Sequence, residues 1–317
     1  MELSIVIPVY NEEENVEPLI QEINAAVGPL GKPYEIVVVD DGSCDATFAV
    51  LARLHQREPG LRVVRLKRNF GQTAAIAAGL TYAGGDVVVL MDGDAQNDPT
   101  DIPALLAELK KGNDLVCGWR SNRRDPFLHR RLPSLIANRL ISWTTQVKLH
   151  DYGCTLKAMR RDVAKSLKLY GEMHRFIPAI AYERGARVAE LKVNHRPRLY
   201  GNSKYGIART LRVVLDLLTV KFLISYSTRP SHVFGVLGFS SGGLGFLIAV
   251  YLTFQKFVYH ETIGGRPLLL LAILLIFIGF QFITMGLLGE MLSRTYHESQ
   301  DKAVFVVREL LSERKCA

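Results

Sequence analysis

The first 120 residues alternate between short apolar runs and longer segments whose apolar residues recur at helical spacing. The apolar runs, rich in Val, Ile and Leu, cover residues 3–9, 34–39, 61–66, 86–91 and 114–118. The segments with helical spacing cover residues 15–27, 45–57, 71–82 and 101–111. Strands that alternate with helices of about 10–15 residues are typical of a parallel sheet with helices on both faces. The pattern therefore predicts an α/β, Rossmann-like domain with a mostly parallel sheet.

Farther along the chain, two stretches lack charged side chains. No Asp, Glu, Lys or Arg lies between Arg229 and Lys256, or from Pro267 to Gly289. Each stretch is longer than the roughly 20 residues that a helix needs to cross a bilayer. We therefore expect two transmembrane helices, at about 231–254 and 267–291. The connection between them is too short for a domain, so the pair should form a hairpin with both ends on one side of the membrane.

Basic residues indicate which side of the membrane holds the hairpin ends. Those that flank the two spans are Arg209, Arg212, Lys221, Arg229, Arg294, Lys302 and Arg308. The connection contains Lys256 and Arg266. Because short loops rich in Lys and Arg stay cytoplasmic, both termini are expected in the cytoplasm of a multi-pass inner-membrane protein.

The overall charge narrows the class of partner. The formal net charge is +8, but basic and aromatic residues do not interleave as they do in nucleic-acid-binding segments. We therefore expect no nucleic acid, and favour a membrane surface and anionic phosphates as partners.

The regions around the hairpin have patterns of their own. Residues 205–226 predict an amphipathic helix, which either lies in the membrane interface or packs on the first domain. Gly238, Gly242, Gly243 and Gly245 permit close helix contact, within the hairpin or between protomers of a homo-oligomer. The C-terminal segment is charged and predicted to be helical.

The expected organisation is a first domain at 1–204, an interfacial region at 205–229, the hairpin at 230–292 and a cytoplasmic tail at 293–317.

The apolar run 86–91 ends in two carboxylates one residue apart, Asp92 and Asp94. Polar groups just past the carboxyl end of a parallel strand lie where open α/β sheets bind ligands. In an extended segment both carboxylates point the same way, and with the amide oxygen of Gln96 they offer hard ligands for Mg²⁺ or Mn²⁺. The alternative is an ordinary turn rich in Asp and Gly.

Other loops follow neighbouring strands and should reach the same edge of the sheet. These are residues 10–12, 40–43, 68–72 and 119–120. Tyr10 is suited to stacking on a base, and Glu12 and Asp40 to accepting hydrogen bonds from a base or ribose. The glycine-rich fingerprint of a Rossmann dehydrogenase and the Walker A motif are both missing from the sequence. The set indicates a pocket for a nucleotide diphosphate.

These segments resemble the successive motifs of family 2 glycosyltransferases, which have the GT-A fold. The motifs are Ile-Pro-Val-Tyr-Asn-Glu at 7–12, Val-Asp-Asp-Gly-Ser at 39–43, Asn-Phe-Gly-Gln at 69–72 and Met-Asp-Gly-Asp-Ala-Gln at 91–96. Asp-Tyr-Gly-Cys at 151–154 and Gly-Asn-Ser-Lys at 201–204 resemble the polyprenyl-phosphate branch, which includes dolichyl-phosphate mannose synthases, bactoprenyl glucosyltransferases and aminoarabinose transferases. The resemblance covers residues 3–204, and the hairpin is similar to that of the bacterial members. Asp-Gly-Asp-Ala-Gln departs from the Asp-Ala-Asp-Leu-Gln common in that branch but keeps each expected ligand.

The resemblance implies roles for individual residues. The expected nucleotide-sugar site comprises Pro8, Tyr10, Asn11, Glu12, Asp40, Gln72 and Asp92. Metal and diphosphate are expected at Asp92, Asp94 and Gln96. Asp94 and Asp151 are the catalytic candidates, with Asp151 acting as a base or as a carboxylate that orients the sugar; a helix cap is the alternative for Asp151.

An anionic lipid head group requires cations, and a group of arginines surrounds the last motifs. The expected acceptor-phosphate contacts are Arg120, Arg130, Arg131, Arg198, Ser203 and Lys204. Arginine can fork two phosphate oxygens, which favours it for this task. A solvated basic surface drawn to anionic lipid is the alternative for some of these residues.

The function predicted from the sequence is the inverting transfer of a sugar from UDP-glucose to undecaprenyl phosphate at the cytoplasmic membrane face. Alternatives with the same chemistry use GDP-mannose and dolichyl phosphate, or a UDP-aminopentose. More distant alternatives are a processive polysaccharide synthase, whose Gln-x-x-Arg-Trp motif is missing from the sequence, and a non-catalytic membrane adaptor.

Overall fold

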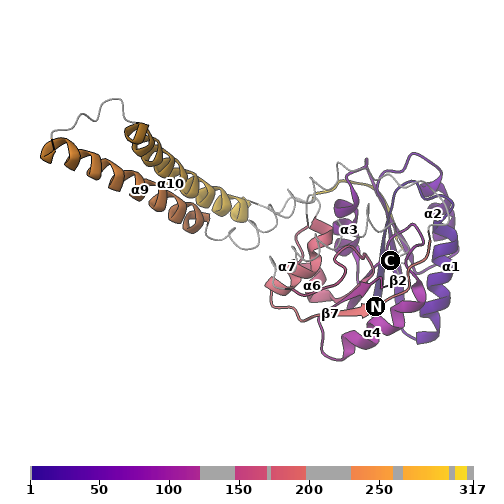
Figure 1. The fold of residues 1–317 in the computed structure, drawn as a ribbon. Coiled ribbons are helices and arrows are strands. Elements are labelled where there is room, and N and C mark those ends of the chain that lie inside the picture. Colours follow the sequence, from indigo (N-terminus) through magenta and orange to yellow (C-terminus); the bar gives the residue numbers. More distant parts are fainter. Residues whose placement is uncertain are drawn as a thin grey trace. The chain divides into compact units, whose positions relative to one another are not determined.

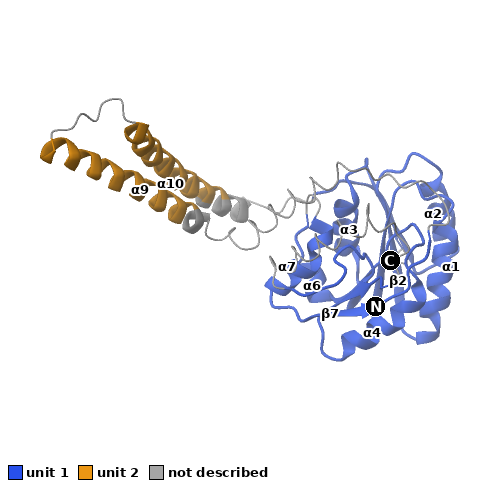
Figure 2. Ribbon diagram, viewed as in Figure 1, with its two compact units in different colours: residues 1–220, 303–317 blue, residues 221–302 orange. Residues whose placement is uncertain are grey.

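The computed structural model describes residues 2–121, 147–169, 173–197, 230–259, 267–299 and 304–312. They form two compact units (Figure 2). The first contains the described residues up to 197 together with 304–312, and the second contains 230–259 and 267–299. The predicted interfacial helix at 205–226 lies outside the described residues.

The first unit is built on a mixed sheet in which the described strands have the order β7-β5-β6-β4-β1-β2-β3-β8. The strands are β1 Leu3–Val9, β2 Tyr34–Asp40, β3 Leu61–Leu66, β4 Val87–Leu90, β5 Leu115–Trp119, β6 Lys157–Arg160, β7 Val188–Lys192 and β8 Val307–Leu311. The pairs β1–β2, β1–β4, β2–β3 and β5–β7 are parallel. Strand β6 is antiparallel to β4 and β5, and β8 is antiparallel to β3. The predicted α/β class with a mostly parallel sheet is confirmed.

Helices cover both faces of the sheet, as Figure 1 shows. They are α1 Val16–Val27, α2 Thr47–His55, α3 Gln72–Tyr82, α4 Ile102–Lys110, α6 Arg161–Ser166 and α7 Ile177–Glu183. Leu3, Ile5 and Ile7 of β1 share one hydrophobic core with the apolar stripes of α1, α2 and α4. Because side chains alternate along a strand, Val6 faces the other side, where α3 packs. Gly79 of α3 makes this approach possible, since a Cβ there would lie 2.2 Å from Val6 Cγ1.

The tail predicted to be helical at 295–317 is the main error of the sequence-based assignment. Helix α10 (Pro267–Ser299) ends early in this region, and Val307–Leu311 forms β8. The exposed edge of β3 offers unpaired backbone groups, and the β-branched run around Val306 and Val307 suits a strand. The pairing extends past the strand itself, because Lys67 N donates to Val306 O at 2.9 Å.

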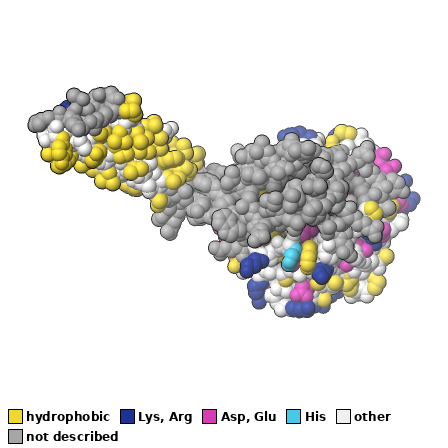
Figure 3. All heavy atoms as spheres, in the orientation of Figure 1, with side chains coloured by type: hydrophobic (Ala, Val, Ile, Leu, Met, Phe, Trp, Pro, Cys, Tyr) yellow, Lys and Arg dark blue, Asp and Glu magenta, His cyan; other side chains and the backbone are white. Residues whose placement is uncertain are grey.

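The second unit is a pair of long apolar helices, α9 Pro230–Val258 and α10. Within them, Phe234–Val258 and Pro267–Gly289 are long and apolar enough to cross a membrane, with mean hydropathies of 1.7 and 2.7. Their large hydrophobic side chains are mostly exposed, among them Phe239 and Phe277. Hydrophobic side chains make up much of the visible surface of these helices in Figure 3. Helices in a soluble core would bury these side chains, so their exposure supports the predicted pair of membrane spans.

Glycines bring the two helices into close contact. A Cβ at Gly238 would lie 2.7 Å from Gly279 O, and one at Gly245 would lie 2.7 Å from Ala272 O. A Cβ at Gly279 would meet Gly238 O and Gly242 N, each at 2.7 Å. By contrast, a Cβ at Gly243 would have no neighbouring atom within 4 Å. The sequence left open whether these glycines act within the hairpin or between protomers; the contacts of Gly238 and Gly245 lie within it.

Replacing Gly279 by Ala should loosen the hairpin, because the new methyl group overlaps backbone atoms of α9. Overpacking of this kind costs about 1–3 kcal/mol. Gly243→Ala is the matched control, since it makes the same change of helix propensity in open space. Thermal unfolding in detergent, followed by a fluorophore pair attached at Phe257 and Leu268, should show a lower transition for Gly279→Ala only. Equal transitions for both variants would contradict this packing.

Candidate active site

Loops after β1 and β2 meet at one edge of the sheet. The two strands are parallel and in register, with Val9 opposite Asp40. Asn11, just after β1, donates its backbone N–H to Ser43 Oγ and accepts from Cys44 N at Oδ1, both at 2.9 Å. Its φ of 56° lies in the left-handed region, which asparagine tolerates better than most residues. Asn11 therefore joins the first two loops of the site.

The other residues near β1 that were predicted for the nucleotide-sugar site lie within the strand or just after it. Pro8 is buried within the strand, opposite Val39. Tyr10 follows the strand and is half-buried. The Glu12 backbone N–H donates to Thr47 Oγ1 at 2.9 Å, and Glu12 Oε2 accepts from Asn15 Nδ2 at 2.6 Å. The structure thus groups Pro8, Tyr10 and Glu12 at the predicted edge.

Asp40 ends β2 and is completely buried. Its Oδ1 accepts from Ser43 N at 2.9 Å. Its Oδ2 lies 3.6 Å from Arg65 Nε and has no hydrogen-bond partner among the described residues. A buried acceptor without a donor is costly, so an N–H or O–H group that bound this oxygen would be stabilising.

Asp41, which the sequence analysis did not select, orders the third loop. Its Oδ1 accepts from Phe70 N at 2.8 Å and its Oδ2 from Gly71 N at 2.9 Å. Burial raises the pKa of Asp41, and these two N–H donors partly offset the rise. The carboxylate therefore holds the segment that leads into α3. The paired acids of the 39–43 motif were the signal that pointed to it.

The metal candidate Asp92 lies just past β4 and is half-buried. Gln72, the first residue of α3, donates through Nε2 to Asp92 Oδ1 at 2.8 Å. Burial raises the pKa of Asp92 to about 6, and the negative charge of Asp94 adds to the rise. A hydrogen bond from Thr155 and the charges of Arg120 and Lys157 act in the opposite direction.

The loop after Asp92 is folded back on itself. Asp94 Oδ1 accepts from Gln96 N at 3.2 Å, and Asn97 Oδ1 accepts from Asp92 N at 3.1 Å. Ala95 between them has a φ of 57°. A non-glycine residue in this left-handed region is strained and is held there by its surroundings. The strained turn keeps Asp92, Asp94 and Gln96 in one short loop at the edge of the sheet.

The oxygen atoms of Asp92, Asp94 and Gln96 in this loop are suitable ligands for a hard divalent cation. Among the described residues, no group of three or more His, Cys, Asp or Glu side chains could hold a metal ion. A dication at Asp92 and Asp94, with or without the Gln96 amide, would therefore need further oxygen ligands from substrate and water. Mg²⁺ is commonly bound in this way, through one or two carboxylates together with substrate phosphates.

Lys157 is a buried cation near this loop. It begins β6, opposite Leu90 of β4, and is 2% exposed. Its Nζ donates to Cys154 O. Its charge acts on Asp92 and also on His174, whose pKa is lowered to about 3 by burial and by Arg175 and Lys157. The sequence analysis did not select Lys157, although a lysine inside the apolar run 156–159 was the available signal.

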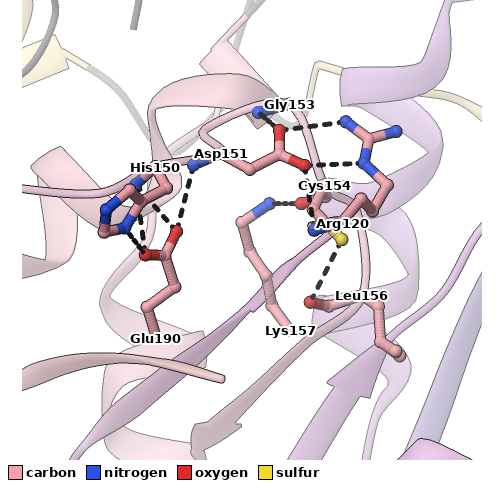
Figure 4. A network of polar contacts seen from close by, with 8 residues as sticks. All are labelled: Arg120, His150, Asp151, Gly153, Cys154, Leu156, Lys157 and Glu190. Carbon is pink, nitrogen blue, oxygen red and sulfur yellow. Dashed lines mark hydrogen bonds and ion pairs between the residues drawn. The ribbon is translucent and has the colours of Figure 1, made fainter. Parts of the chain in front are cut away.

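Arg120 and Asp151, predicted separately as acceptor contact and catalytic residue, form one ion pair (Figure 4). Nε of Arg120 donates to Asp151 Oδ2 at 2.7 Å, and Nη2 donates to Oδ1 at 3.0 Å. Gly153 N also donates to Oδ1, at 3.1 Å. Donors on both oxygens favour an orienting carboxylate over a proton acceptor. The helix-cap alternative is wrong, because strand β6 is the next element after Asp151.

The segment after β7 is bound to the Asp92 loop. Arg196 donates its backbone N–H to Gln96 O at 2.9 Å, and its Nη2 lies 2.8 Å from Asp98 Oδ1. Its Nη1 donates to Glu22 Oε2 of α1 at 2.6 Å. Sequence reasoning missed Arg196, since nothing in its local pattern pointed to residues so far away in the chain. The predicted acceptor residues Arg130, Arg131, Arg198, Ser203 and Lys204 lie outside the described residues.

Comparisons with known proteins agree with this arrangement. The family model described as "Glycosyl transferase family 2" matches residues 4–168. The dodecaprenyl-phosphate galacturonate synthase of Rhizobium johnstonii is 46% identical over 321 residues, covering 100% of this chain and 95% of the relative. The undecaprenyl-phosphate 4-deoxy-4-formamido-L-arabinose transferase of Pseudomonas fluorescens is 38% identical over 318 residues, covering 99% and 92%.

Solved structures extend the comparison to the fold. Glucosyl-3-phosphoglycerate synthase from Mycobacterium tuberculosis, in complex with Mn²⁺ and UDP-glucose, superposes with a TM-score of 0.56 at 21% identity, covering 69% of this chain and 78% of that chain. Mannosyl-3-phosphoglycerate synthase from Rubrobacter xylanophilus superposes with a TM-score of 0.58 at 18% identity, covering 70% and 74%. The GT-A fold expected from the sequence is confirmed.

Removing the Arg196 side chain should loosen the Asp92 loop. Its ion pairs are half-exposed, so their loss is worth about 1 kcal/mol. Arg196→Ala should therefore speed amide hydrogen exchange of residues 92–98 by about fivefold, as measured by mass spectrometry. Arg187→Ala, which removes a comparable Arg–Asp pair at the other end of β7, should leave these residues unchanged. Equal exchange in both variants would show that Arg196 does not hold the loop.

Proposed function

Because the chain belongs to glycosyltransferase family 2, we propose that it transfers one sugar from a nucleotide-diphosphate sugar to a polyprenyl phosphate. One observation carries this proposal. Three strands of the same sheet carry polar groups at their carboxyl ends. Buried Asp40 ends β2, the carboxylates of Asp92 and Asp94 follow β4, and Arg120, which is paired with Asp151, follows β5. The names of the two relatives, a dodecaprenyl-phosphate and an undecaprenyl-phosphate sugar enzyme, support the acceptor class.

The nucleoside would bind at the ends of β1 and β2. Asp40 Oδ2, buried and without a hydrogen-bond donor among the described residues, is suited to an N–H group of a base or a ribose hydroxyl. Tyr10 and Glu12 flank it on the neighbouring loop, with Pro8 and Asn11 shaping that loop. Gln72 links this half of the site to Asp92.

The diphosphate would lie over Asp92, Asp94 and Gln96, which have the hard oxygen atoms that suit Mg²⁺ or Mn²⁺. A dication bound there would neutralise the departing diphosphate. The Mn²⁺ in the M. tuberculosis structure supports a divalent cation. The carboxylates hold the donor in place, and the strained turn at Ala95 keeps them oriented before substrate binds.

The reaction is an in-line displacement with inversion. An oxygen of the acceptor phosphate forms a bond to the anomeric carbon of the sugar while the bond to the nucleoside diphosphate breaks. That oxygen is anionic near neutral pH, so positioning and charge stabilisation matter more than a strong base. Arg120 is suited to hold the acceptor phosphate, because two of its five N–H groups bind Asp151 and the other three have no hydrogen-bond partner among the described residues.

The acceptor would come from the membrane that the hairpin spans. Strand β8 supports this topology, because the chain returns after α10 to pair with β3 of the first unit. A chain that leaves a domain, crosses the bilayer twice and rejoins the same sheet has both hairpin ends on the side of that domain. The basic flanks favour the cytoplasmic side of the inner membrane.

The names of the two relatives bear on the identity of the sugar. Sequence analysis favoured UDP-glucose. The relative at 46% identity is named for galacturonate and the one at 38% for a formamido-arabinose. We therefore rank a galacturonate donor first, and keep glucose and the aminopentose as the next candidates.

The decisive assay adds undecaprenyl or dolichyl phosphate to the detergent-solubilised protein with a divalent cation and one of these sugar nucleotides. The proposal expects cation-dependent release of nucleoside diphosphate and one lipid-linked sugar. A processive synthase would build polymer, and a non-catalytic adaptor would release nothing. Either result would overturn the proposal.

Asp94→Ala should lower transfer by at least about 100-fold, since it removes one of two carboxylates that hold the donor. The variant should stay folded and membrane-bound, because Asp94 is not a core residue. Asp86→Asn is the matched control: Asp86 lies just before β4, at the other end of the strand, and is 70% exposed. Its turnover should match that of the wild type. Near-normal turnover by purified Asp94→Ala would remove the proposed metal role.

Cation binding should weaken below about pH 6. The protein without cation has a pKa of about 6 at Asp92, and the ionised form is the ligand, so protons compete with the metal below that value. The affinity for Mn²⁺, measured by calorimetry, should be about tenfold lower at pH 5 than at pH 7.5. In Asp92→Asn this step near pH 6 should vanish. An affinity that does not change over this range would show that Asp92 is not a ligand.

A further inference from the structure

Glu190 of β7 belongs to a polar network that also contains the Arg120–Asp151 pair (Figure 4). Its carboxylate accepts three N–H groups. His150 N donates to both oxygens at 2.9 and 3.1 Å, Asp151 N donates to Oε1 at 3.0 Å, and His150 Nδ1 lies 2.7 Å from Oε2. The side chain is only 11% exposed. Glu190 therefore binds the backbone of two consecutive residues at the start of the 151–154 motif, His150 and Asp151.

The ring of His150 is held on a second side. It stacks on Trp119 of β5 with ring centroids 4.2 Å apart and an interplanar angle of 16°. Lys192 Nζ, also on β7, lies 5.0 Å from the Trp119 ring. Nδ1 can donate to Glu190 in a neutral tautomer as well as in the protonated ring, so this contact does not require a charged histidine. His150 thus contacts the last residue of β5 and the middle residue of β7 at the same time.

These contacts lead directly to the acceptor side of the site. Glu190 fixes the backbone of Asp151, and the carboxylate of Asp151 fixes the guanidinium of Arg120 with two hydrogen bonds. Arg120 itself follows Trp119 at the end of β5. The contacts therefore run from Glu190 through Asp151 to Arg120. A small displacement at Glu190 would be passed to the arginine, and misplacement of a substrate-binding group by 1 Å costs up to about 100-fold in rate.

We propose that Glu190 is a positioning residue that sets the orientation of Arg120 towards the acceptor phosphate, acting through His150 and Asp151. The proposal rests on the proposed function, in which Arg120 contacts the acceptor. Glu190 does not touch substrate in this arrangement. Its loss should alter use of the lipid acceptor and leave use of the sugar nucleotide intact, because the donor residues lie on other loops.

Glu190→Gln is the first variant, since it keeps the size of the side chain but replaces one acceptor oxygen by an NH₂ group that faces N–H donors. Steady-state kinetics should show a loss of about tenfold in kcat/KM for polyprenyl phosphate. The KM for the sugar nucleotide should change by less than about twofold. Glu108→Gln is the control: this glutamate lies in the last turn of α4, outside the site, and also accepts side-chain hydrogen bonds. It should behave as the wild type does.

A purely structural role predicts a different result. In that case Glu190→Gln would lower the melting temperature and leave acceptor kinetics unchanged below it, or would impair donor and acceptor equally. Either result would overturn the proposal. If Glu190→Gln does not fold, His150→Phe replaces it, because phenylalanine keeps an aromatic ring beside Trp119 and the backbone N–H group and lacks the Nδ1 bond to Glu190. The same acceptor-specific loss is expected, and its absence would overturn the proposal.

A double-mutant cycle tests the route through Arg120. In an Arg120→Lys background the guanidinium is already gone, so Glu190→Gln should lower acceptor kcat/KM by less than about twofold. A further tenfold loss in that background would show that Glu190 acts independently of Arg120, and would contradict the proposal. A wild-type protein that used another anionic acceptor would overturn the proposed function alone, and the same cycle with that acceptor would still test Glu190.

Discussion

The repulsion between Asp92 and Asp94 at the end of β4 is the constraint on which the site depends. Two partly buried carboxylates in one short loop would lose charge or separate unless their surroundings compensated. The surroundings do so with a hydrogen bond from Gln72, another from Thr155 and the positive charges of Arg120 and Lys157. The compensation is incomplete, because the pKa of Asp92 stays above its usual range. A divalent cation bound between the two carboxylates would remove the remaining repulsion and so stabilise the loop.

The loops that carry the site are ordered by side chains from other loops. Asn11 binds the β2 loop, Asp41 binds the segment before α3, and Arg196 binds the Asp92 loop. Asn11 and Asp41 bind the backbone of a segment far away in the chain with their side chains. Arg196 binds the Asp98 side chain with its guanidinium and Gln96 O with its backbone N–H. Such cross-links keep the loops in one conformation before substrate arrives, which lowers the entropy cost of assembling the reacting groups. The sheet places the loops at a common edge, and these hydrogen bonds and ion pairs fix the positions of the loops relative to one another.

The sequence was informative where the signal is local. Apolar runs and helical spacing located the elements from β1 to β5, since each is defined by a pattern within about ten residues. The acids at 92 and 94 were recognised because they directly follow such a run. Contacts between distant segments leave no local pattern in the sequence. Glu190 binds a residue about 40 positions away, and Arg196 binds Gln96, about 100 positions away, and Glu22, which is farther still. Strand β8 was missed for the same reason, because only the open edge of β3 makes it a strand.

The central claim is that Asp92 and Asp94 hold a dication on the diphosphate of a sugar donor. The most direct measurement is anomalous diffraction from crystals of the full chain grown with Mn²⁺ and a nucleoside diphosphate. The claim predicts one manganese peak bonded to oxygens of both carboxylates and to both phosphates, with the nucleoside against Asp40. A manganese bound elsewhere, or a diphosphate bound without contact to this loop, would contradict it.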